Sequence, residues 1–409
     1  MLELLPPPPT DPLWDLTYEF GADERPERLN LVLGVYRDET GTTPVMAAVR
    51  EAEIRLAQRS ESKEYRGLSG NAAFNRALLE LVLGPGPEGP YGPSGRAAAV
   101  QTVAGSGALR LLADLICRTR PGTTVWVSDP AYVNHRPILE AAGLKVRPYG
   151  WRDAAGGFDA AGVLRELRGA RRDDVVLLQG CCHNPTGVDP LPEDWEALAE
   201  SAVRGGWVPF VDLAYHGLGD GLEADLLATR MLAERVPEML IAVSCSKNFG
   251  LYSDRVGCAI VLGASDRAVR HAETALQNAA RTLYSMPPEH GAAVVTTILE
   301  DEGLRAAWRA ELDVMRGRIT ANRADLAAHL SALGRAEQAR SLARQKGMFS
   351  MLPLTPHQML RLRRQYAVYG TTSGRINIAG IPAHRIPGLA RSIAAVLDPA
   401  DRPRAVLPV

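Results

Sequence analysis

The sequence predicts an α/β protein built on a mostly parallel sheet. Short apolar runs rich in β-branched residues alternate with longer amphipathic segments, which is typical of repeated strand–helix units. The apolar runs are nearly continuous, which indicates strands that helices cover on both faces. We expect the clearest strands at TVWVS (124–128), DVVLLQG (174–180), WVPFVD (207–212) and LIAVSCS (240–246).

Amphipathic patterns predict helices at residues 108–118, 191–204 and 355–369. The last of these begins with Thr355, Pro356 and Gln358, a capping box with proline at the first helical position. From about residue 300 the chain becomes helical and rich in arginine and alanine. Two short strand-like pieces follow, KGMFSML (346–352) and GRINIAG (374–380), so we expect a second, smaller α/β domain.

Length and composition limit the classes of function. The 409 residues are 46% hydrophobic and 23% charged, enough for two domains, and the net charge of −1 gives no basic field for nucleic acid or an anionic membrane. No apolar run reaches about 18 residues, and the N-terminus does not resemble a signal peptide. The prolines at 6–9 predict a stiff, extended arm. The five cysteines have no metal-binding spacing, so we expect thiols in a reducing cytoplasm and no metal site.

One lysine stands at the end of a predicted buried strand. Lysine and arginine together number 46, but the lysines are only Lys63, Lys145, Lys247 and Lys346. Lys247 directly follows the apolar run 240–246. Arginine stays protonated, whereas lysine can lose its proton and form a Schiff base, so Lys247 is a candidate nucleophile.

Other polar residues end or follow the neighbouring strands, and in open α/β sheets ligands bind outside the carboxyl ends of the strands. These residues are Tyr132, Asn134, His135, Asn184, Asp212 and Tyr215. The small residues of TVAGSG (102–107) precede a predicted helix, whose N-terminal amides could bind a phosphate. A phosphate cradle, an aromatic face, a carboxylate, a phenol and an amine together suit pyridoxal 5′-phosphate held by a Schiff base.

Longer motifs carry a specific resemblance. They are LNLVLGVYRDETG, KEYRGLSG, VQTVAGSGALR, CCHNPTGVDP, VDLAYHG, SCSKNFGLYSDRVG, GMFS and SGRINIAG. Their order and spacing resemble those of class I aminotransferases of the aspartate/aromatic family. The resemblance implies fold type I, with a mostly parallel seven-stranded sheet in the large domain. It also implies an N-terminal arm and part of the small domain at 1–40, a large cofactor-binding domain at 41–310 and a small C-terminal domain at 311–409.

The resemblance implies roles for residues that bind the cofactor. Lys247 would hold it as a Schiff base and, once displaced, would move the substrate proton. Asp212 would face the pyridine nitrogen, with His135 hydrogen-bonded to the carboxylate, and Tyr215 and Asn184 would bind the phenolic oxygen. The phosphate would be bound by Gly105, Ser106, Ser244, Arg255 and, from the neighbouring subunit of a homodimer, Tyr65.

The resemblance also implies residues that bind the substrate, an amino acid or a 2-oxo acid. Arg375 would grip its α-carboxylate, and Arg281 of the other subunit would grip the distal carboxylate of a dicarboxylic substrate. Gly34 would let the backbone approach the substrate. Tyr132, Asn184 and Met286 would also lie beside it.

Several positions depart from the family pattern. Tyr132 stands where a tryptophan usually stacks on the cofactor, and Met286 where the aspartate enzymes commonly carry asparagine. Trp14, Val32 and His216 also depart from the usual residues. One interpretation is neutral drift. The other is a pocket enlarged for an aromatic side chain, in which Arg281 serves 2-oxoglutarate and moves aside for a ring.

The first functional hypothesis is an L-amino acid:2-oxoglutarate aminotransferase that favours tryptophan, phenylalanine or tyrosine. The alternative is an aspartate aminotransferase, which Arg281 favours and which Met286 and Tyr132 disfavour. Pyridoxal-dependent lyase or decarboxylase chemistry is a further alternative, because it shares the lysine and the aspartate. A non-catalytic regulator would carry an appended DNA-binding module, and we expect none before residue 29.

Overall fold

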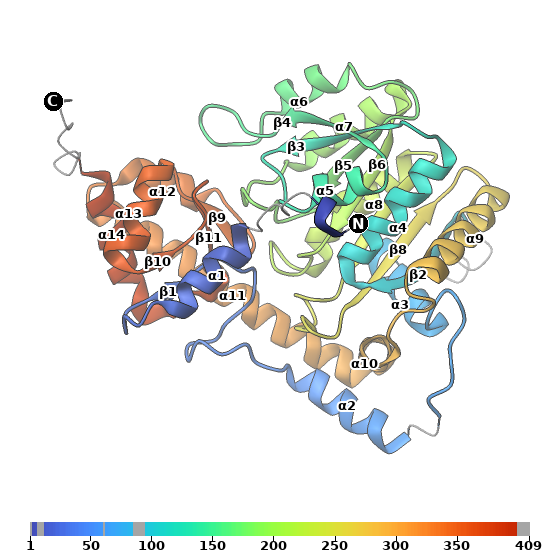
Figure 1. Ribbon diagram of the computed structural model, residues 1–409, viewed down its shortest axis with the longest axis horizontal. Coiled ribbons are helices and arrows are strands. Elements are labelled where there is room, and N and C mark those ends of the chain that lie inside the picture. Colours follow the sequence, from blue (N-terminus) through green and yellow to red (C-terminus); the bar gives the residue numbers. More distant parts are fainter. Residues whose placement is uncertain (1, 6–11, 60–61, 85–94, 399–409) are drawn as a thin grey trace. The chain divides into compact units, whose positions relative to one another are not determined.

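The computed structural model describes residues 2–5, 12–59, 62–84 and 95–398, so the expected proline arm lies outside the described residues. The chain forms two compact units, and each is described by itself (Figure 1). The larger unit comprises residues 44–317. The smaller unit combines the described residues up to Thr43 with those from Arg318 on. The domain assignment at residues 40 and 310 stays a prediction.

A seven-stranded sheet is the centre of the larger unit. In spatial order its strands are β2 (Ala97–Val103), β8 (Val256–Leu262), β7 (Met239–Ser244), β6 (Val208–Leu213), β5 (Val175–Gln179), β3 (Thr124–Asp129) and β4 (Lys145–Gly150). Strand β8 runs opposite to the other six strands, which are parallel to one another, so the predicted mostly parallel sheet is confirmed. The four strands expected from sequence are β3, β5, β6 and β7, placed to within two residues at each end.

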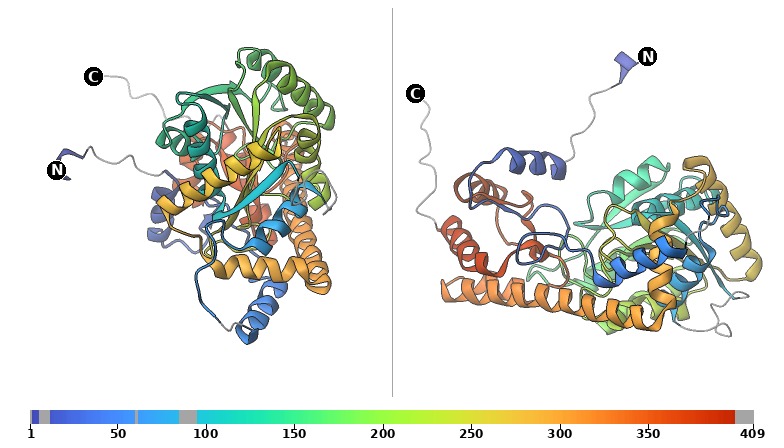
Figure 2. Two further views of the ribbon diagram at one scale, coloured as in Figure 1. Left: turned by 90° about the vertical axis from the view of Figure 1, so that its right-hand side faces the viewer. Right: turned by 90° about the horizontal axis from the view of Figure 1, so that it is seen from below.

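Helices cover both faces of this sheet (Figures 1 and 2). They are α3 (Ala72–Leu83), α4 (Ala104–Thr119), α5 (His135–Ala141), α6 (Ala160–Leu167), α7 (Pro192–Gly205), α8 (Leu222–Arg235), α9 (Asp266–Leu283) and α10 (Glu289–Glu300). Helix α2 (Ala47–Arg59) packs on α10 and lies away from the sheet (Figure 1). Helix α4 packs on β7 and β8, where Leu109 and Leu112 join Val261 in the hydrophobic core. Every residue of β5 is buried, as the continuous apolar run predicted.

Helix α4 begins earlier than the sequence predicted. We expected it from residue 108, after a turn formed by TVAGSG, but it begins at Ala104 directly after β2. Ala104 has a φ of 56°, and its backbone N–H donates to the Arg255 carbonyl at 3.0 Å. This sharp turn lets the strand pass into the helix without a loop. Gly105 and Ser106 therefore lie in the first helical turn.

The smaller unit contains two small sheets. Its elements are η1 (Leu2–Leu4), α1 (Pro12–Ala22), β1 (Leu29–Asn30), α12 (Ala336–Ala343), β9 (Phe349–Met351), α13 (Pro356–Tyr366), β10 (Val368–Tyr369), β11 (Arg375–Asn377), η2 (Ile378–Gly380), η3 (Ala383–Arg385) and α14 (Ile386–Leu397). Strand β1 pairs in parallel with β10, and β9 pairs antiparallel with β11. Helix and strand occur together here, as predicted for the second α/β region.

The predicted capping box of α13 is confirmed. The Gln358 backbone N–H donates to Thr355 Oγ1, and the Thr355 backbone N–H donates to Gln358 Oε1. The helix ends at Tyr366, three residues before the predicted end, because Ala367 takes a left-handed φ of 54°. Residues 368 and 369 then form β10.

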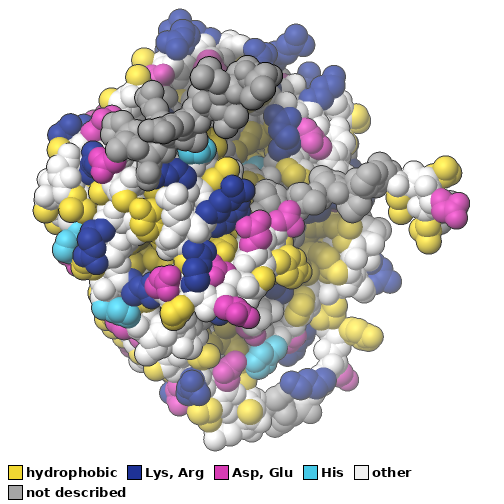
Figure 3. All heavy atoms as spheres, turned by 60° about the vertical axis from the view of Figure 1, so that its left-hand side comes forward, with side chains coloured by type: hydrophobic (Ala, Val, Ile, Leu, Met, Phe, Trp, Pro, Cys, Tyr) yellow, Lys and Arg dark blue, Asp and Glu magenta, His cyan; other side chains and the backbone are white. Residues whose placement is uncertain are grey.

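Helix α11 (Glu302–Ala332) is the longest element, and the boundary between the two units falls within it. It is long enough to span a bilayer but too polar, and among the described residues no helix is both long and apolar enough to cross a membrane. Basic and acidic side chains are interspersed on the face that Figure 3 draws. That mixture agrees with the near-zero net charge of the sequence.

Candidate active site

Lys247 lies in the turn that follows β7, beside the end of β6. Its side chain is half-buried, and its Nζ atom lies 5.1 Å from the centroid of the Tyr215 ring. Burial lowers the pKa of this amine to about 8; the Asp212 carboxylate opposes the shift and the Arg255 guanidinium adds to it. Lys247 thus loses its proton more readily than a surface lysine, as an amine nucleophile requires.

Asp212 lies within β6, and His135 begins α5. The His135 Nε2 atom lies 2.8 Å from Asp212 Oδ2, and both side chains are buried. The ring of Tyr132 meets the His135 ring edge to face, with 5.2 Å between centroids. The predicted carboxylate, imidazole and aromatic ring therefore lie together at the carboxyl end of the sheet.

Asn184 and Tyr215 meet from the loops that follow β5 and β6. The Asn184 Nδ2 atom donates to the Tyr215 hydroxyl at 3.1 Å. Gln179, the last residue of β5, holds the Asn184 backbone through two hydrogen bonds of 2.8 Å, one to its N–H and one to its carbonyl. An amide and a phenol are thus oriented side by side, where they could bind one oxygen atom of a ligand.

The first turn of α4 and the Arg255 side chain form a cradle suited to an anion. Arg255 donates to Ser106 Oγ at 3.4 Å and to Ser246 Oγ at 3.3 Å. A Cβ atom on Gly105 would lie 2.9 Å from the Ser244 Cβ, so only glycine leaves this approach open. A guanidinium, hydroxyls and helix N-terminal amides are the donors that bind phosphate groups.

Three of the expected site residues in the larger unit stand apart from this hydrogen-bonded cluster. Tyr65 is 92% exposed, and Arg281 is exposed in the last turn of α9. Met286 is half-buried and follows Ser285, whose φ is 65°. The structure records no hydrogen bond or ion pair between the Tyr65 or Arg281 side chain and the described residues.

The remaining expected residues belong to the smaller unit. Arg375 is buried, donates to the Val32 carbonyl at 2.8 Å and lies 4.4 Å from the centroid of the Phe349 ring. Gly34 packs so closely on Phe349 that a Cβ atom would lie 2.5 Å from its Cζ. Val32, one of the residues that depart from the family pattern, has a fully buried side chain beside Leu16. Trp14 is 53% exposed on α1.

Sequence reasoning missed several buried polar residues whose hydrogen bonds hold the loops that carry the site residues. Gln179 is a polar residue in an otherwise apolar strand, and that contrast was a visible signal. His183 is buried between Ser128 and Thr186, to which it is hydrogen-bonded, and stacks on Trp151. Asn248 had no signal in the sequence because its partners, His216 and Trp308, come from distant segments.

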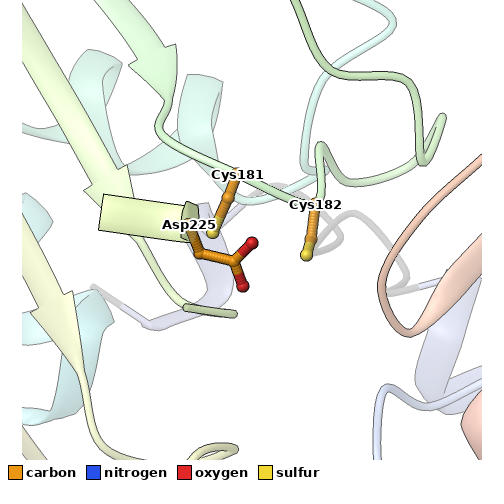
Figure 4. A group of neighbouring side chains, drawn as sticks. All are labelled: Cys181, Cys182 and Asp225. Carbon is orange, nitrogen blue, oxygen red and sulfur yellow. The ribbon is translucent and has the colours of Figure 1, made fainter. Parts of the chain in front are cut away.

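A second polar cluster joins the loop after β5 to the first turn of α8 (Figure 4). The side-chain ligand atoms of Cys181, Cys182 and Asp225 lie within 4.8 Å of one another, and all three residues are buried. However, the Asp225 oxygens already accept hydrogen bonds from the backbone N–H groups of residues 217, 219 and 220. Interaction with Cys182 raises the pKa of the Cys181 thiol, whereas metals bind thiolates. We assign the cluster a structural role at the start of α8.

Comparison with known proteins gives one consistent result. A model of the family described as aminotransferase class I and II matches residues 26–393. The chain is 42% identical to the aspartate aminotransferase of Salmonella typhi over 398 residues and to the aromatic-amino-acid aminotransferase of Paracoccus denitrificans over 397 residues. Each match covers 97% of this chain and 100% of the relative. An aromatic-amino-acid aminotransferase structure from Burkholderia pseudomallei, covalently bound to pyridoxal phosphate, is 36% identical with a TM-score of 0.94. That match covers 97% of this chain and 100% of the other.

Proposed function

The chain is an aminotransferase of the class I and II family, and from this premise we propose that it uses pyridoxal 5′-phosphate and favours aromatic L-amino acids as donors, with 2-oxoglutarate as acceptor. The observation that carries the proposal is the position of the Lys247 amine. It lies over the Tyr215 ring, and the charges of Asp212 and Arg255 act on it. A carboxylate, an amine, a phenol and an anion cradle occur together within the larger unit.

The residues of the larger unit fit this cofactor group by group. We assign the phosphate to the cradle of Gly105, Ser106, Ser244 and Arg255. Arg255 donates to Ser106 Oγ, and Ser244 Oγ accepts from the Ser246 backbone N–H, so these side chains are already oriented. We assign the phenolic oxygen to Tyr215 and Asn184, which share a hydrogen bond. Asp212, oriented by His135, supplies a carboxylate for the ring nitrogen. The Tyr132 ring offers an aromatic face beside them.

When bound, the cofactor supplies an electron-withdrawing ring that stabilises negative charge at the substrate Cα. Asp212 would favour a protonated ring nitrogen, because a buried carboxylate stabilises a positive charge beside it. The Lys247 amine, when it is not bound to the cofactor, would move a proton between the substrate Cα and the cofactor carbon on the other side of the imine nitrogen. Its lowered pKa suits that exchange near neutral pH.

We propose that Arg375 binds the substrate α-carboxylate and that Gly34 lets the backbone approach the substrate. Arg375 is buried and lies over an aromatic ring, which supports a guanidinium held in one orientation. Arg281 would bind the distal carboxylate of 2-oxoglutarate. Met286, Asn184 and Tyr132 would line the side-chain pocket, where methionine gives an adaptable apolar wall for a ring.

The functional unit that we propose is a homodimer with composite active sites. Tyr65 and Arg281 are exposed in the single chain, which supports a role toward a second copy. All five cysteines are free thiols, which supports a reducing compartment, the cytoplasm. No nucleic acid or membrane partner is included in the proposal.

Aspartate aminotransferase remains the second candidate, supported by the relative from Salmonella typhi and by Arg281. The deciding experiment mixes purified holoenzyme with L-tryptophan or L-aspartate without an acceptor and follows the absorbance of the bound cofactor. Faster conversion of the bound cofactor by tryptophan supports the aromatic preference. Faster conversion by aspartate supports the second candidate. Repeated product release at each site in the absence of an oxo acid would point to elimination or decarboxylation, because a transaminase stops after one release per site. Lys247→Ala should lose both the spectrum and turnover, and a Lys247→Ala variant that kept turning over would refute the proposal.

A further inference from the structure

Two pairs of adjacent residues face each other at the ends of β6 and β7. Tyr215 and His216 follow β6, and Lys247 and Asn248 follow β7. The His216 Nε2 atom lies 2.8 Å from Asn248 Nδ2, and both side chains are fully buried. An amide NH₂ group can only donate, so His216 Nε2 accepts this hydrogen bond and the imidazole is neutral.

Each of the two loops has a separate anchor elsewhere in the larger unit. Asn248 accepts a hydrogen bond of 2.7 Å at its carbonyl from Trp308 Nε1, and the Phe249 ring stacks on Trp308 with 4.4 Å between centroids. On the other side, the Gly217 backbone N–H donates to Asp225 Oδ2 at 2.8 Å. The hydrogen bond between His216 and Asn248 joins these separately anchored loops directly.

Tyr215 and Lys247, which directly precede His216 and Asn248, are the residues with proposed roles in the reaction. The Lys247 amine lies 5.1 Å from the centroid of the Tyr215 ring, and the lysine side chain is long and flexible. Its position depends on where its backbone is held. We propose that His216 is a positioning residue: its hydrogen bond to Asn248 fastens the Lys247 loop to the Tyr215 loop and so fixes the amine over the tyrosine ring. This inference depends on the proposed attachment of the cofactor to Lys247.

A purely structural role for His216 would need only its volume. A buried apolar residue of similar size would fill the same space without removing a polar group from water. A buried hydrogen bond instead gives a fixed direction, and a buried donor left without its acceptor is unfavourable. If His216 only fills volume, an apolar residue of similar size should replace it well. If it positions the Lys247 loop, only a residue that keeps the hydrogen bond should replace it.

The test compares three variants of the full-length holoenzyme. His216→Leu removes the acceptor, whereas His216→Gln keeps one, because its Oε1 atom can accept from Asn248 Nδ2. Thr229→Val is the matched control, since Thr229 is fully buried on α8 and its hydroxyl has no partner among the described residues. The measurements are the pH midpoint of the bound-cofactor absorbance, kcat and KM for the amino donor, and the thermal unfolding midpoint.

In His216→Leu, the loosened Lys247 side chain should become more exposed, which favours the protonated form of its Schiff-base nitrogen. We therefore expect the spectral midpoint to rise by about half a pH unit or more. We expect kcat to fall about tenfold with KM unchanged, because proton transfer depends on position and ground-state binding does not. His216→Gln and Thr229→Val should stay within about 0.2 pH unit of the unmodified protein.

A folded His216→Leu protein with the midpoint and kcat of Thr229→Val would overturn the proposal. If His216→Leu does not fold, Asn248→Ser is the second variant, because it removes the Nδ2 donor and keeps the carbonyl that Trp308 binds. An unchanged midpoint in Asn248→Ser would equally overturn the positioning role. Failure of the proposed function would give a different result. In that case the unmodified protein and Lys247→Ala would show the same absorbance, with no band from cofactor bound to Lys247.

Discussion

The Nε2 atom of His135 lies 2.8 Å from the Oδ2 atom of Asp212, and neither side chain has appreciable contact with solvent. The two residues come from different elements, His135 from the start of α5 and Asp212 from inside β6. Their hydrogen bond fixes the direction of the carboxylate. A carboxylate held in this way, in surroundings of low dielectric, interacts strongly with a neighbouring positive charge.

Asp212→Asn should therefore lower kcat by about a thousandfold, because an amide cannot favour a protonated ring nitrogen. The thermal unfolding midpoint should change little, since the side chain keeps its shape. His135→Asn should have a smaller effect on kcat, about tenfold, because it removes only the orientation of the carboxylate. Steady-state kinetics on both variants make the comparison. An Asp212→Asn variant with kcat close to that of the unmodified enzyme would contradict the assigned role.

The lowered pKa of Lys247 predicts how cofactor attachment depends on pH. Pyridoxal phosphate added to the protein freed of cofactor should attach faster as pH rises to about 8 and then level off, since the neutral amine is the nucleophile. The measurement is the rate of appearance of bound-cofactor absorbance from about pH 6 to about pH 10. A rate that still rises between about pH 9 and about pH 10, as for an ordinary lysine of pKa about 10.4, would show that burial does not act on this amine.

Arg281→Ala should separate dicarboxylic from aromatic substrates. We expect kcat/KM for aspartate and 2-oxoglutarate to fall by about a hundredfold or more, because a charge-assisted pair with the distal carboxylate is lost. For phenylalanine in the half-reaction the loss should be small. The exposed Arg267 on α9 provides a control. Arg267→Ala should leave kcat/KM for the dicarboxylic substrates and the half-reaction with phenylalanine unchanged. Equal losses for both substrates would mean that Arg281 is structural.

Gly34→Ala should destabilise the smaller unit. Its new Cβ atom would lie 2.5 Å from Phe349 Cζ, closer than non-bonded carbon atoms approach, so the ring must move. We expect the free energy of unfolding to fall by about 1–3 kcal/mol, as for other overpacked sites. Gly21→Ala is the control in the same unit, because a Cβ atom there meets nothing within 4 Å. Equal stability of the two variants in urea unfolding would refute the close contact.

His216 should make the protein less stable in acid. Burial lowers the pKa of His216 to about 4, so between that pH and about 6.5 the unfolded chain binds a proton that the folded chain does not. Stability from this residue is therefore lost as pH falls below about 6.5. From about pH 7 to about pH 5 the unmodified protein should lose about 2 kcal/mol more than His216→Gln, whose side chain does not titrate.

Urea unfolding at both pH values measures this difference. Asp225 acts in the opposite direction, because burial raises its pKa to about 6 and its folded form gains a proton as pH falls. Asp225 is present in both proteins, so its contribution cancels in the comparison. Identical pH dependence of the two proteins would show that His216 is not held neutral by burial.

Residues at strand ends were predictable from sequence because parallel strands carry their carboxyl ends to one edge of the sheet. Lys247, Asp212, Tyr215 and Asn184 follow apolar runs, so their proximity required only the strands and their direction. Element boundaries were less predictable. The expected turn before α4 is the first turn of the helix itself, because Ala104 adopts a left-handed backbone conformation that residue types alone do not specify.

The sequence by itself determined the α/β class, the strands of the sheet, the chemical groups at their ends and the resemblance to the family. These depend on periodicity and on local order along the chain. Tertiary structure decided which side chains form hydrogen bonds with the site residues and their loops. His135 reaches Asp212 across 77 positions, and Trp308 reaches Asn248 across 60. A side-chain hydrogen bond has a reach of about 3 Å and a narrow range of angles, so it exists only once packing has set both backbones.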